Sequence, residues 1–172
     1  MVDEKMAKSK LTIHVLMVCL GNICRSPTAN GVLEQCIHDR GLSDNIKVDS
    51  AGTGDWHIGE PPDFRSLEAA ARRGYDLSRQ RARQVDLTDF HSFDYVLAMD
   101  KTNLRDLQRL CPQEFQENLS LFLDFGSPDY ESVPDPYYSG VQGFELVLDL
   151  VEEASSNLLD HIIKRHELLA EH

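Results

Sequence analysis

Residues 13–28 read IHVLMVCLGNICRSPT, which is an apolar run, a short loop with one glycine and the start of a helix. A short apolar run that ends at such a loop is typical of a buried strand. Ser26 is a residue type favoured at helix N-caps, and Pro27 suits the first position of a helix. The stretch therefore predicts a strand, a tight loop and a helix in direct succession, with Cys19 at the end of the strand.

This loop combines a nucleophile with an anion-binding site. The loop amides and the amino end of the following helix direct partial positive charge at Cys19. We expect a thiol in that position to lose its proton easily, and the thiolate is the nucleophilic form. Arg25 adds a planar guanidinium that matches a phosphate group through two hydrogen bonds. Gly21 allows the backbone to come close to a ligand.

Strand and helix patterns alternate along the rest of the chain. We expect strands at 11–18, 46–50, 93–98 and 119–123, helices at 27–40, 66–73, 101–111 and 141–169, and a long loop at 126–140. This alternation indicates a parallel sheet with helices on both faces. Ligands of such folds bind beyond the carboxyl ends of the strands, where Cys19, Ser50 and Asp100 lie.

The composition excludes several classes of protein. The chain has 172 residues and a formal net charge of −12, so we expect one domain that repels nucleic acid. Its apolar runs are shorter than the roughly 20 residues that span a bilayer, so we expect no membrane association and a cytoplasmic location. We interpret residues 1–10 as a flexible arm and residues 11–172 as the domain.

The cysteines and arginines allow two further interpretations. The four cysteines do not form a secreted disulfide framework at this length, and none pairs as Cys-x2-Cys, so we expect neither a metal nor another cofactor. Arginines gather between residues 72 and 83, at Arg72, Arg73, Arg79, Arg81 and Arg83. We interpret this group as a solvated basic face, with substrate docking as the alternative.

The loop at Cys19 resembles the Cys-x5-Arg-Ser/Thr signature of cysteine-dependent phosphatases, and its place near the N-terminus resembles that of the low-molecular-weight protein tyrosine phosphatases. Three later stretches resemble the same family in order: residues 49–53, 93–100 and 134–138. The resemblance runs from about Thr12 to the last helix. It implies a single-domain, three-layer αβα sandwich with a central four-stranded parallel sheet and the phosphate-binding loop after the first strand.

The resemblance also implies an activity and the residues that perform it. The expected reaction is hydrolysis of phosphotyrosine monoesters, with Cys19 forming a phosphocysteine, Arg25 holding the phosphate and Asp135 acting as general acid. The residues expected to bind phosphate are Leu20, Gly21, Asn22, Ile23, Cys24, Arg25 and Ser26. Expected partners are phosphotyrosine-containing proteins, small aryl phosphates in vitro and inorganic phosphate as an inhibitory product.

Other residues are expected to support the loop or to line the substrate pocket. In the family an asparagine braces the loop and a serine of the second strand is its partner, which here implies Asn22 and Ser50. Ser26 can both cap the helix and donate a hydrogen bond to the Cys19 thiolate. From the resemblance and from the size of their side chains, we expect the walls of the substrate pocket to be Ile23, Trp56, Tyr137 and Tyr138. A deep slot between them would favour phosphotyrosine over the shorter phosphoserine.

Cys24 and Gln80 are two further candidate residues. Cys24 is a second thiol in the loop, and it could capture an oxidised Cys19 as a disulfide or simply fill space. Many relatives place a histidine under the loop shortly before the stretch that matches residues 82–85. The nearest position here holds Gln80, whose amide can still form hydrogen bonds.

Three alternative functions stay open at this point. Protein-arginine phosphatases resemble this loop but carry threonine where Ile23 stands, so the isoleucine favours tyrosine. Arsenate reductases share the Cys-x5-Arg loop and relay electrons through late cysteines, whereas Cys111 is the last cysteine here. A phosphate-dependent binding module is the non-enzyme alternative, and turnover of p-nitrophenyl phosphate separates it from the enzymes.

Overall fold

The protein is built around a four-stranded parallel sheet with the strand order β2-β1-β3-β4. The computed structural model describes residues 12–137 and 139–169, so the expected arm at 1–10 and Tyr138 lie outside the described residues. The strands are β1 (Ile13–Cys19), β2 (Ile46–Gly52), β3 (Tyr95–Ala98) and β4 (Leu119–Leu121). The predicted sheet is confirmed.

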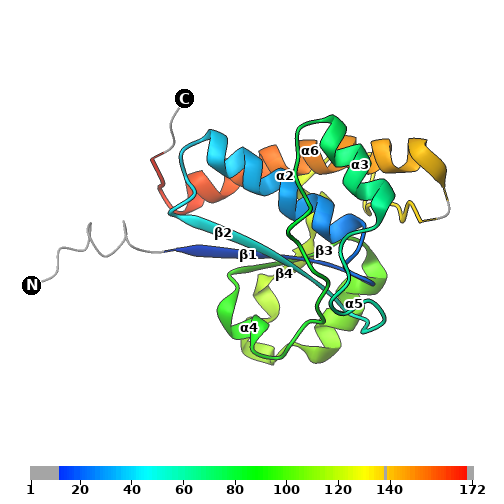
Figure 1. Ribbon diagram of the computed structural model, residues 1–172. Helices are drawn as coiled ribbons and strands as arrows, with labels where there is room; N and C mark the ends of the chain where they lie inside the picture. Colours follow the sequence, from blue (N-terminus) through cyan, green and yellow to red (C-terminus); the bar gives the residue numbers. More distant parts are fainter. Residues whose placement is uncertain (1–11, 138, 170–172) are drawn as a thin grey trace, which may run out of the picture.

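Helices cover both faces of the sheet (Figure 1). Helices α2 (Arg25–Asp39), α3 (Phe64–Arg72) and α6 (Gly140–Arg165) lie on one face, and α4 (Asp89–Ser92) and α5 (Lys101–Leu110) lie on the other. The side chains of β1 alternate between the two layers, as the pleat of a strand requires. Met17 packs in the core of α2 and α6, whereas Leu16 and Val18 pack in the core that contains Phe90. The three-layer αβα architecture is therefore confirmed.

The start of α2 differs from the prediction. The helix begins at Arg25, two residues before Pro27, and its N-cap is Cys24. Ser26 therefore lies within the first turn of the helix and is not the N-cap. Its hydroxyl group contacts the sulfur of Cys19 instead. Among the described residues, no side chain caps this helix end, so its first amides are free of a capping oxygen on the protein.

Other element ends also differ from the prediction. Helix α3 starts at Phe64 because the carboxylate of Asp63 accepts a hydrogen bond from the amide of Arg65 and acts as N-cap. Strand β4 stops at Leu121 and the chain continues as a 3₁₀ helix, η2 (Phe122–Phe125). Helix α6 ends at Arg165, before the expected residue 169. Helix α4 and the 3₁₀ helix η1 (Gln113–Asn118) are short, and the sequence did not predict them.

The carboxyl ends of β1 and β2 meet at Gly52. We call residues 19–25 the cysteine loop. The amides of Thr53 and Gly54 donate hydrogen bonds of 2.9 Å to the carbonyl oxygens of Cys19 and Leu20. A Cβ atom at Gly52 would lie 2.6 Å from the carbonyl oxygen of Leu20 and 3.2 Å from the amide nitrogen of Asn22. Glycine at this position thus allows β2 to support the cysteine loop from below.

Within the described residues, no helix combines the length and the apolar character needed to cross a membrane.

We expect Gly52→Ala to destabilise the protein by about 1–3 kcal/mol, because the new methyl group meets backbone atoms that cannot rotate away. Urea unfolding monitored by circular dichroism measures the change. Gly126→Ala is the matched control, since its Cβ would meet the side-chain atom Leu123 Cδ2 at 3.2 Å, and that side chain can move. Equal unfolding midpoints for the two variants would contradict the close approach at Gly52.

Candidate active site

The sulfur of Cys19 lies inside the cysteine loop and has two polar neighbours. The amide of Asn22 donates a hydrogen bond to Cys19 Sγ at 3.3 Å, and Ser26 Oγ lies 3.0 Å from the same sulfur. Asn22 has a φ of 57°, the left-handed region that asparagine tolerates better than most residues. The amide of Asn22 thus faces back toward the sulfur across the loop. Both neighbours are placed to donate hydrogen bonds to a thiolate.

The side chain of Asn22 connects the loop to its surroundings. Its Nδ2 donates to Ser26 Oγ and to Ser50 Oγ, both at 2.9 Å, and its Oδ1 accepts from the amide of Arg83 at 3.0 Å. The structure thus brings together Asn22 and Ser50, the pair that the sequence singled out. Asn22 is buried, and these three bonds use all but one of the hydrogen-bonding sites of its amide.

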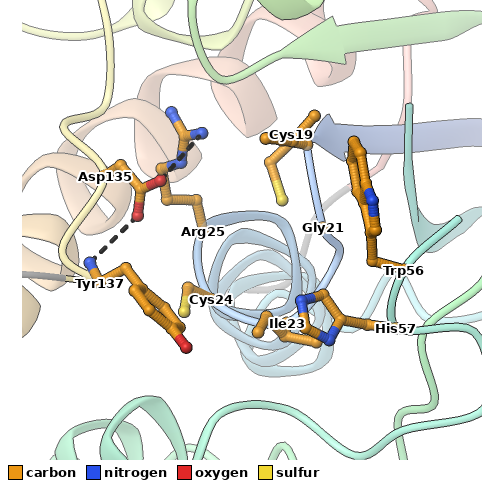
Figure 2. A pocket seen from close by; sticks show the side chains of 10 residues that line it. Cys19, Gly21, Ile23, Cys24, Arg25, Trp56, His57, Asp135 and Tyr137 are labelled. Carbon is orange, nitrogen blue, oxygen red and sulfur yellow. Dashed lines mark hydrogen bonds and ion pairs between the residues drawn. The ribbon is translucent and has the colours of Figure 1, made fainter. Parts of the chain in front are cut away.

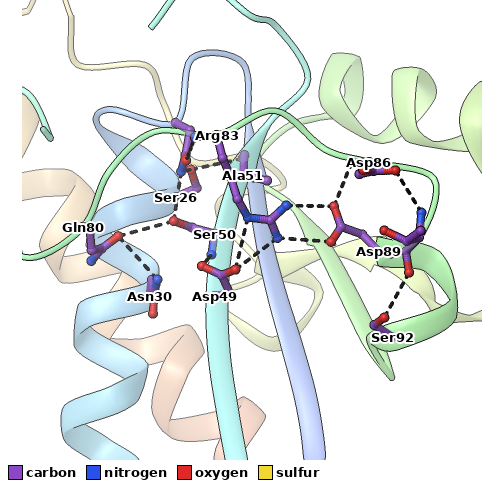
Figure 3. A network of polar contacts seen from close by, with 12 residues as sticks. Ser26, Asn30, Asp49, Ser50, Ala51, Gln80, Arg83, Asp86, Asp89 and Ser92 are labelled. Carbon is purple, nitrogen blue, oxygen red and sulfur yellow. Dashed lines mark hydrogen bonds and ion pairs between the residues drawn. The ribbon is translucent and has the colours of Figure 1, made fainter. Parts of the chain in front are cut away.

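Gln80 lies beneath the loop in the same network (Figure 3). Its Oε1 accepts from Ser50 Oγ and from Asn30 Nδ2, both at 3.3 Å, and its Nε2 donates to the carbonyl oxygen of Pro27 at 2.9 Å. Gln80 thus supplies an amide that donates and accepts at once. Unlike a histidine, it does not change its charge with pH.

Arg25 is buried at the floor of the site. Its Nη1 donates to Asp100 Oδ2 at 2.7 Å and to the carbonyl oxygen of Val133 at 3.0 Å. Asp100 also caps α5, because its Oδ1 accepts from the amide of Asn103 at 2.8 Å. The sequence predicts Asp100 at a strand end but contains no signal for its ion pair with Arg25. A buried guanidinium needs such a partner, because an unpaired buried charge is strongly unfavourable.

Asp135 faces Arg25 from the loop before α6. Its Oδ2 lies 4.0 Å from Arg25 Nη2, and its Oδ1 accepts a hydrogen bond from the amide of Tyr137 at 3.1 Å (Figure 2). The carboxylate is 55% exposed, so solvent reaches it in this state. Asp129, in the same loop, has its backbone amide bonded to Ser127 Oγ and does not line the cavity.

Two contacts hold the Asp135 loop (residues 126–137) in place. The amide of Val133 donates to the carbonyl oxygen of Met99 at 2.8 Å, which attaches the loop to the end of β3. Arg65 Nη1 donates to the carbonyl oxygen of Tyr137 at 2.8 Å, and its guanidinium lies over the Tyr137 ring, 5.2 Å from the centroid. Residues from β3 and α3 therefore both fix the position of the carboxylate.

A cavity of about 330 Å³ opens above the sulfur of Cys19. Trp56 and Tyr137 stand on opposite sides of it, and Ile23 lies between them on the loop (Figure 2). The cavity thus gathers Cys19, Leu20, Gly21, Ile23, Cys24, Arg25, Trp56, Asp135 and Tyr137 from the expected residues. Asn22, Ser26 and Ser50 lie below its floor instead.

His57 also lines the cavity, and the sequence analysis missed it. A Cβ atom on Gly21 would lie 3.1 Å from His57 Cδ2, so the imidazole lies against the loop where a glycine leaves room. Its Nδ1 pairs with Glu60. Its place beside Trp56 was the available signal, but a lone histidine in a loop has no pattern that marks it.

Cys24 is buried beside the cavity and is chemically distinct from a reactive thiol. Burial raises the pKa of Cys24 to about 12, although the Ser66 hydroxyl acts in the opposite direction. Cys24 is therefore a protonated thiol at neutral pH.

Among the described residues, no group of three or more histidine, cysteine, aspartate or glutamate side chains could hold a metal ion.

The arrangement brings together a sulfur with two hydrogen-bond donors, a buried guanidinium, an accessible carboxylate and a cavity with aromatic walls. The donors and the cation suit an anionic group placed over the sulfur, and the carboxylate of Asp135 lines the same cavity. Such a site can transfer a phosphoryl group to sulfur and supply a proton to the departing oxygen.

Known proteins are similar to this chain in sequence and in fold. A sequence model of the family described as low molecular weight phosphotyrosine protein phosphatase matches residues 14–168. A low molecular weight protein-tyrosine-phosphatase of Bacillus subtilis is 41% identical over 157 residues, which cover 91% of this chain and 99% of the relative. The low molecular weight phosphotyrosine protein phosphatase of Homo sapiens is 42% identical over 138 residues, or 79% of this chain and 87% of the relative. A protein tyrosine phosphatase structure from Entamoeba histolytica aligns with a TM-score of 0.86 at 37% identity and covers 91% of this chain and 100% of that chain.

Proposed function

Because the chain belongs to the low molecular weight phosphotyrosine protein phosphatase family and is an enzyme of that class, we propose that it removes phosphate from protein phosphotyrosine through a phosphocysteine on Cys19. The observation that carries the proposal is the position of Cys19 Sγ. It lies at the floor of the cavity, 3.0 Å from Ser26 Oγ and 3.3 Å from the amide nitrogen of Asn22. Both groups can stabilise the thiolate that attacks phosphorus.

In the first step the thiolate attacks phosphorus in line and the tyrosine oxygen leaves. The transition state of phosphoryl transfer is loose, so catalysis depends on positioning and on stabilisation of the equatorial oxygens. Arg25 and the amides of residues 20–25 supply the donors in this proposal. Water then hydrolyses the phosphocysteine and releases inorganic phosphate, which binds the same donors and should inhibit as a product.

Asp135 is the proposed general acid. Its Oδ2 lies 4.0 Å from Arg25 Nη2 and the residue lines the cavity, which supports a role beside a phosphate bound to Arg25. In the first step it protonates the departing phenolic oxygen, and in the second its carboxylate takes a proton from water. The bond from the amide of Tyr137 to Oδ1 leaves Oδ2 free to face the leaving group.

The walls of the cavity support a preference for aromatic phosphate esters. Trp56 and Tyr137 flank the opening, and the apolar side chain of Ile23 lies between them on the loop. A phenyl ring fits between such walls, and its length allows the phosphate to reach the floor. Tyr138, which we also proposed as a wall, lies outside the described residues. The partners we propose are phosphotyrosine proteins, with small aryl phosphates as substrates in vitro.

A reducing compartment suits this chemistry, and we propose the cytoplasm as the place of action. The cysteines Cys19, Cys24, Cys36 and Cys111 are all free thiols. A nucleophilic thiolate works only while it is reduced, and cytosolic thiols are kept reduced. Peroxide would convert Cys19 to a sulfenic acid. The Cys24 thiol would then attack that sulfur, form a disulfide and release water, which protects Cys19 from irreversible oxidation.

We expect Cys19→Ser to lower the hydrolysis of p-nitrophenyl phosphate to the background rate while the protein stays folded, because a serine hydroxyl is not ionised in this position. Steady-state kinetics with circular dichroism measure both properties. In parallel, the wild type should prefer phosphotyrosine peptides to phosphoserine and phosphoarginine peptides. Full activity of the folded variant would overturn the role of Cys19.

Replacement of Asp135 by alanine should lower kcat on phosphotyrosine by about 10²–10⁴-fold, because the phenolic oxygen then departs without a proton. The loss should be smaller with p-nitrophenyl phosphate, whose leaving group needs a proton less. Asp129→Ala is the control, since Asp129 lies in the same loop outside the cavity. A larger, leaving-group-dependent loss in the Asp129 variant would mean that Asp129 is the general acid and that Asp135 is not.

Oxidation provides a pH-dependent test. After brief treatment with peroxide, mass spectrometry should find a disulfide between Cys19 and Cys24, and a thiol reductant should restore activity. Because the pKa of Cys24 is raised to about 12, the reactive thiolate becomes more abundant as the pH increases, so the disulfide should form faster at pH 9 than at pH 7. Cys24→Ser should recover less activity. Oxidised protein in which these two cysteines are never linked would refute the protective role.

A further inference from the structure

Arg83 lies between two carboxylates, one from each side of the loop that carries it (Figure 3). Its Nε and Nη2 contact Asp49 Oδ2 at 3.1 and 3.0 Å, and its Nη1 and Nη2 contact the two oxygens of Asp89 at 2.9 and 3.2 Å. The side chain is 33% exposed. Arg83 thus differs from the free, solvated arginine that we expected in the basic face, because its guanidinium pairs with carboxylates on two sides.

The backbone of Arg83 reaches the cysteine loop directly. Its amide donates to Asn22 Oδ1 at 3.0 Å, and its carbonyl oxygen accepts from the amide of Gly52 at 2.8 Å. The first contact holds the residue whose own amide faces the sulfur of Cys19. The second holds the glycine on which the loop rests. One residue thus touches both backbone supports of the site, although its side chain does not line the cavity.

The two carboxylates extend this support into the sheet and into the opposite layer. Asp49 directly precedes Ser50 on β2, and its Oδ1 accepts from the amide of Ser50 at 2.8 Å. Asp89 begins α4, is 10% exposed, and accepts from the amide of Asp86 at 2.8 Å. Its neighbour Phe90 is fully buried in the core beneath the sheet. The ion cluster therefore joins the Ser50 strand and the α4 layer to the backbone at residue 83.

Asn22 needs such support because its conformation is strained. Even for asparagine, a left-handed φ of 57° is less favourable than the right-handed region, so contacts with the surroundings help to maintain it. Two of the three partners of the Asn22 side chain, Ser50 and the amide of Arg83, sit on segments that the Arg83 side chain clamps. If these segments loosen, the amide of Asn22 can turn away from Cys19.

We propose that Arg83 is a positioning residue of the reaction: through Asp49 and Asp89 it holds its own backbone amide against Asn22, and Asn22 in turn holds its amide on the nucleophile Cys19. The inference rests on the proposed role of Cys19. Arg83 acts through the shape of the loop and not through contact with substrate. Its loss should therefore change how readily Cys19 ionises, besides any change in stability.

The experiment compares Arg83→Gln with the wild type. The rate of Cys19 alkylation by iodoacetamide is measured as a function of pH in both proteins. In Arg83→Gln the midpoint of this profile should lie about one pH unit higher, the size expected for loss of one hydrogen bond to a charged sulfur. The acidic limb of kcat/KM for p-nitrophenyl phosphate should move in the same direction, and kcat/KM at pH 6 should fall about 10-fold. Arg83→Lys should recover part of the loss, because lysine keeps the charge but not the planar fork.

Arg73→Gln is the matched control. Arg73 is also a partly buried arginine that pairs with three carboxylates, Glu145, Asp149 and Glu152 of α6, and these contacts lie away from the cysteine loop. It should lower the unfolding midpoint and leave the alkylation midpoint unchanged. If Arg83→Gln behaves in the same way, Arg83 is merely structural and the proposal is overturned.

A second variant covers the case in which Arg83→Gln does not fold. Asp49→Asn changes a carboxylate that is half exposed, and it should give the same upward shift at a smaller size. An unchanged midpoint in that folded variant overturns the proposal as well. Alkylation needs no turnover, so these outcomes are distinct from failure of the proposed function, which would appear as activity in Cys19→Ser.

Discussion

The hydrogen bonds of the Asn22 side chain are the interaction on which the site depends. A single buried amide binds the first turn of α2 through Ser26, the second strand through Ser50 and the segment at residue 83 through its backbone. These three parts come from distant places in the sequence, and they meet at one side chain. The three contacts together stabilise the left-handed turn at Asn22. The geometry of the cysteine loop is thus a property of the folded domain and not of the loop alone.

The charges of the site are arranged on a different principle. Arg25 is buried and pairs with Asp100, while Asp135 approaches the same guanidinium from the exposed side. Because Asp100 already compensates the charge of Arg25, the distant carboxylate of Asp135 adds little to its stability. A phosphate dianion carries more negative charge than a carboxylate and so binds the guanidinium more strongly. The chain as a whole is acidic, with a formal net charge of −12. The affinity for an anion must therefore come from this local group, because the overall field opposes it.

Much of the fold and of the site could be predicted from the sequence, because the relevant signals are local. The apolar run before Cys19 and the spacing to Arg25 lie within one stretch, and alternating strand and helix patterns were enough for the parallel sheet. The contacts that sequence reasoning missed are tertiary. Asp100 pairs with Arg25 because β1 and β3 are neighbours in the sheet, and no pattern within one strand encodes that pairing. Of the two roles expected for Ser26, the contact with the sulfur of Cys19 is present, whereas the N-cap is Cys24.

The contacts of Arg25 have a consequence for the entropy of substrate binding. A free arginine side chain loses about 1.5–2 kcal/mol of rotamer freedom when it is held in one conformation. Here Asp100 and the carbonyl oxygen of Val133 already hold Nη1 at 2.7 and 3.0 Å before any ligand arrives. The entropic cost of fixing the Arg25 side chain therefore arises during folding, where burial of the hydrophobic core offsets it. An arriving phosphate then finds the guanidinium already fixed, so this loss of side-chain freedom does not weaken binding.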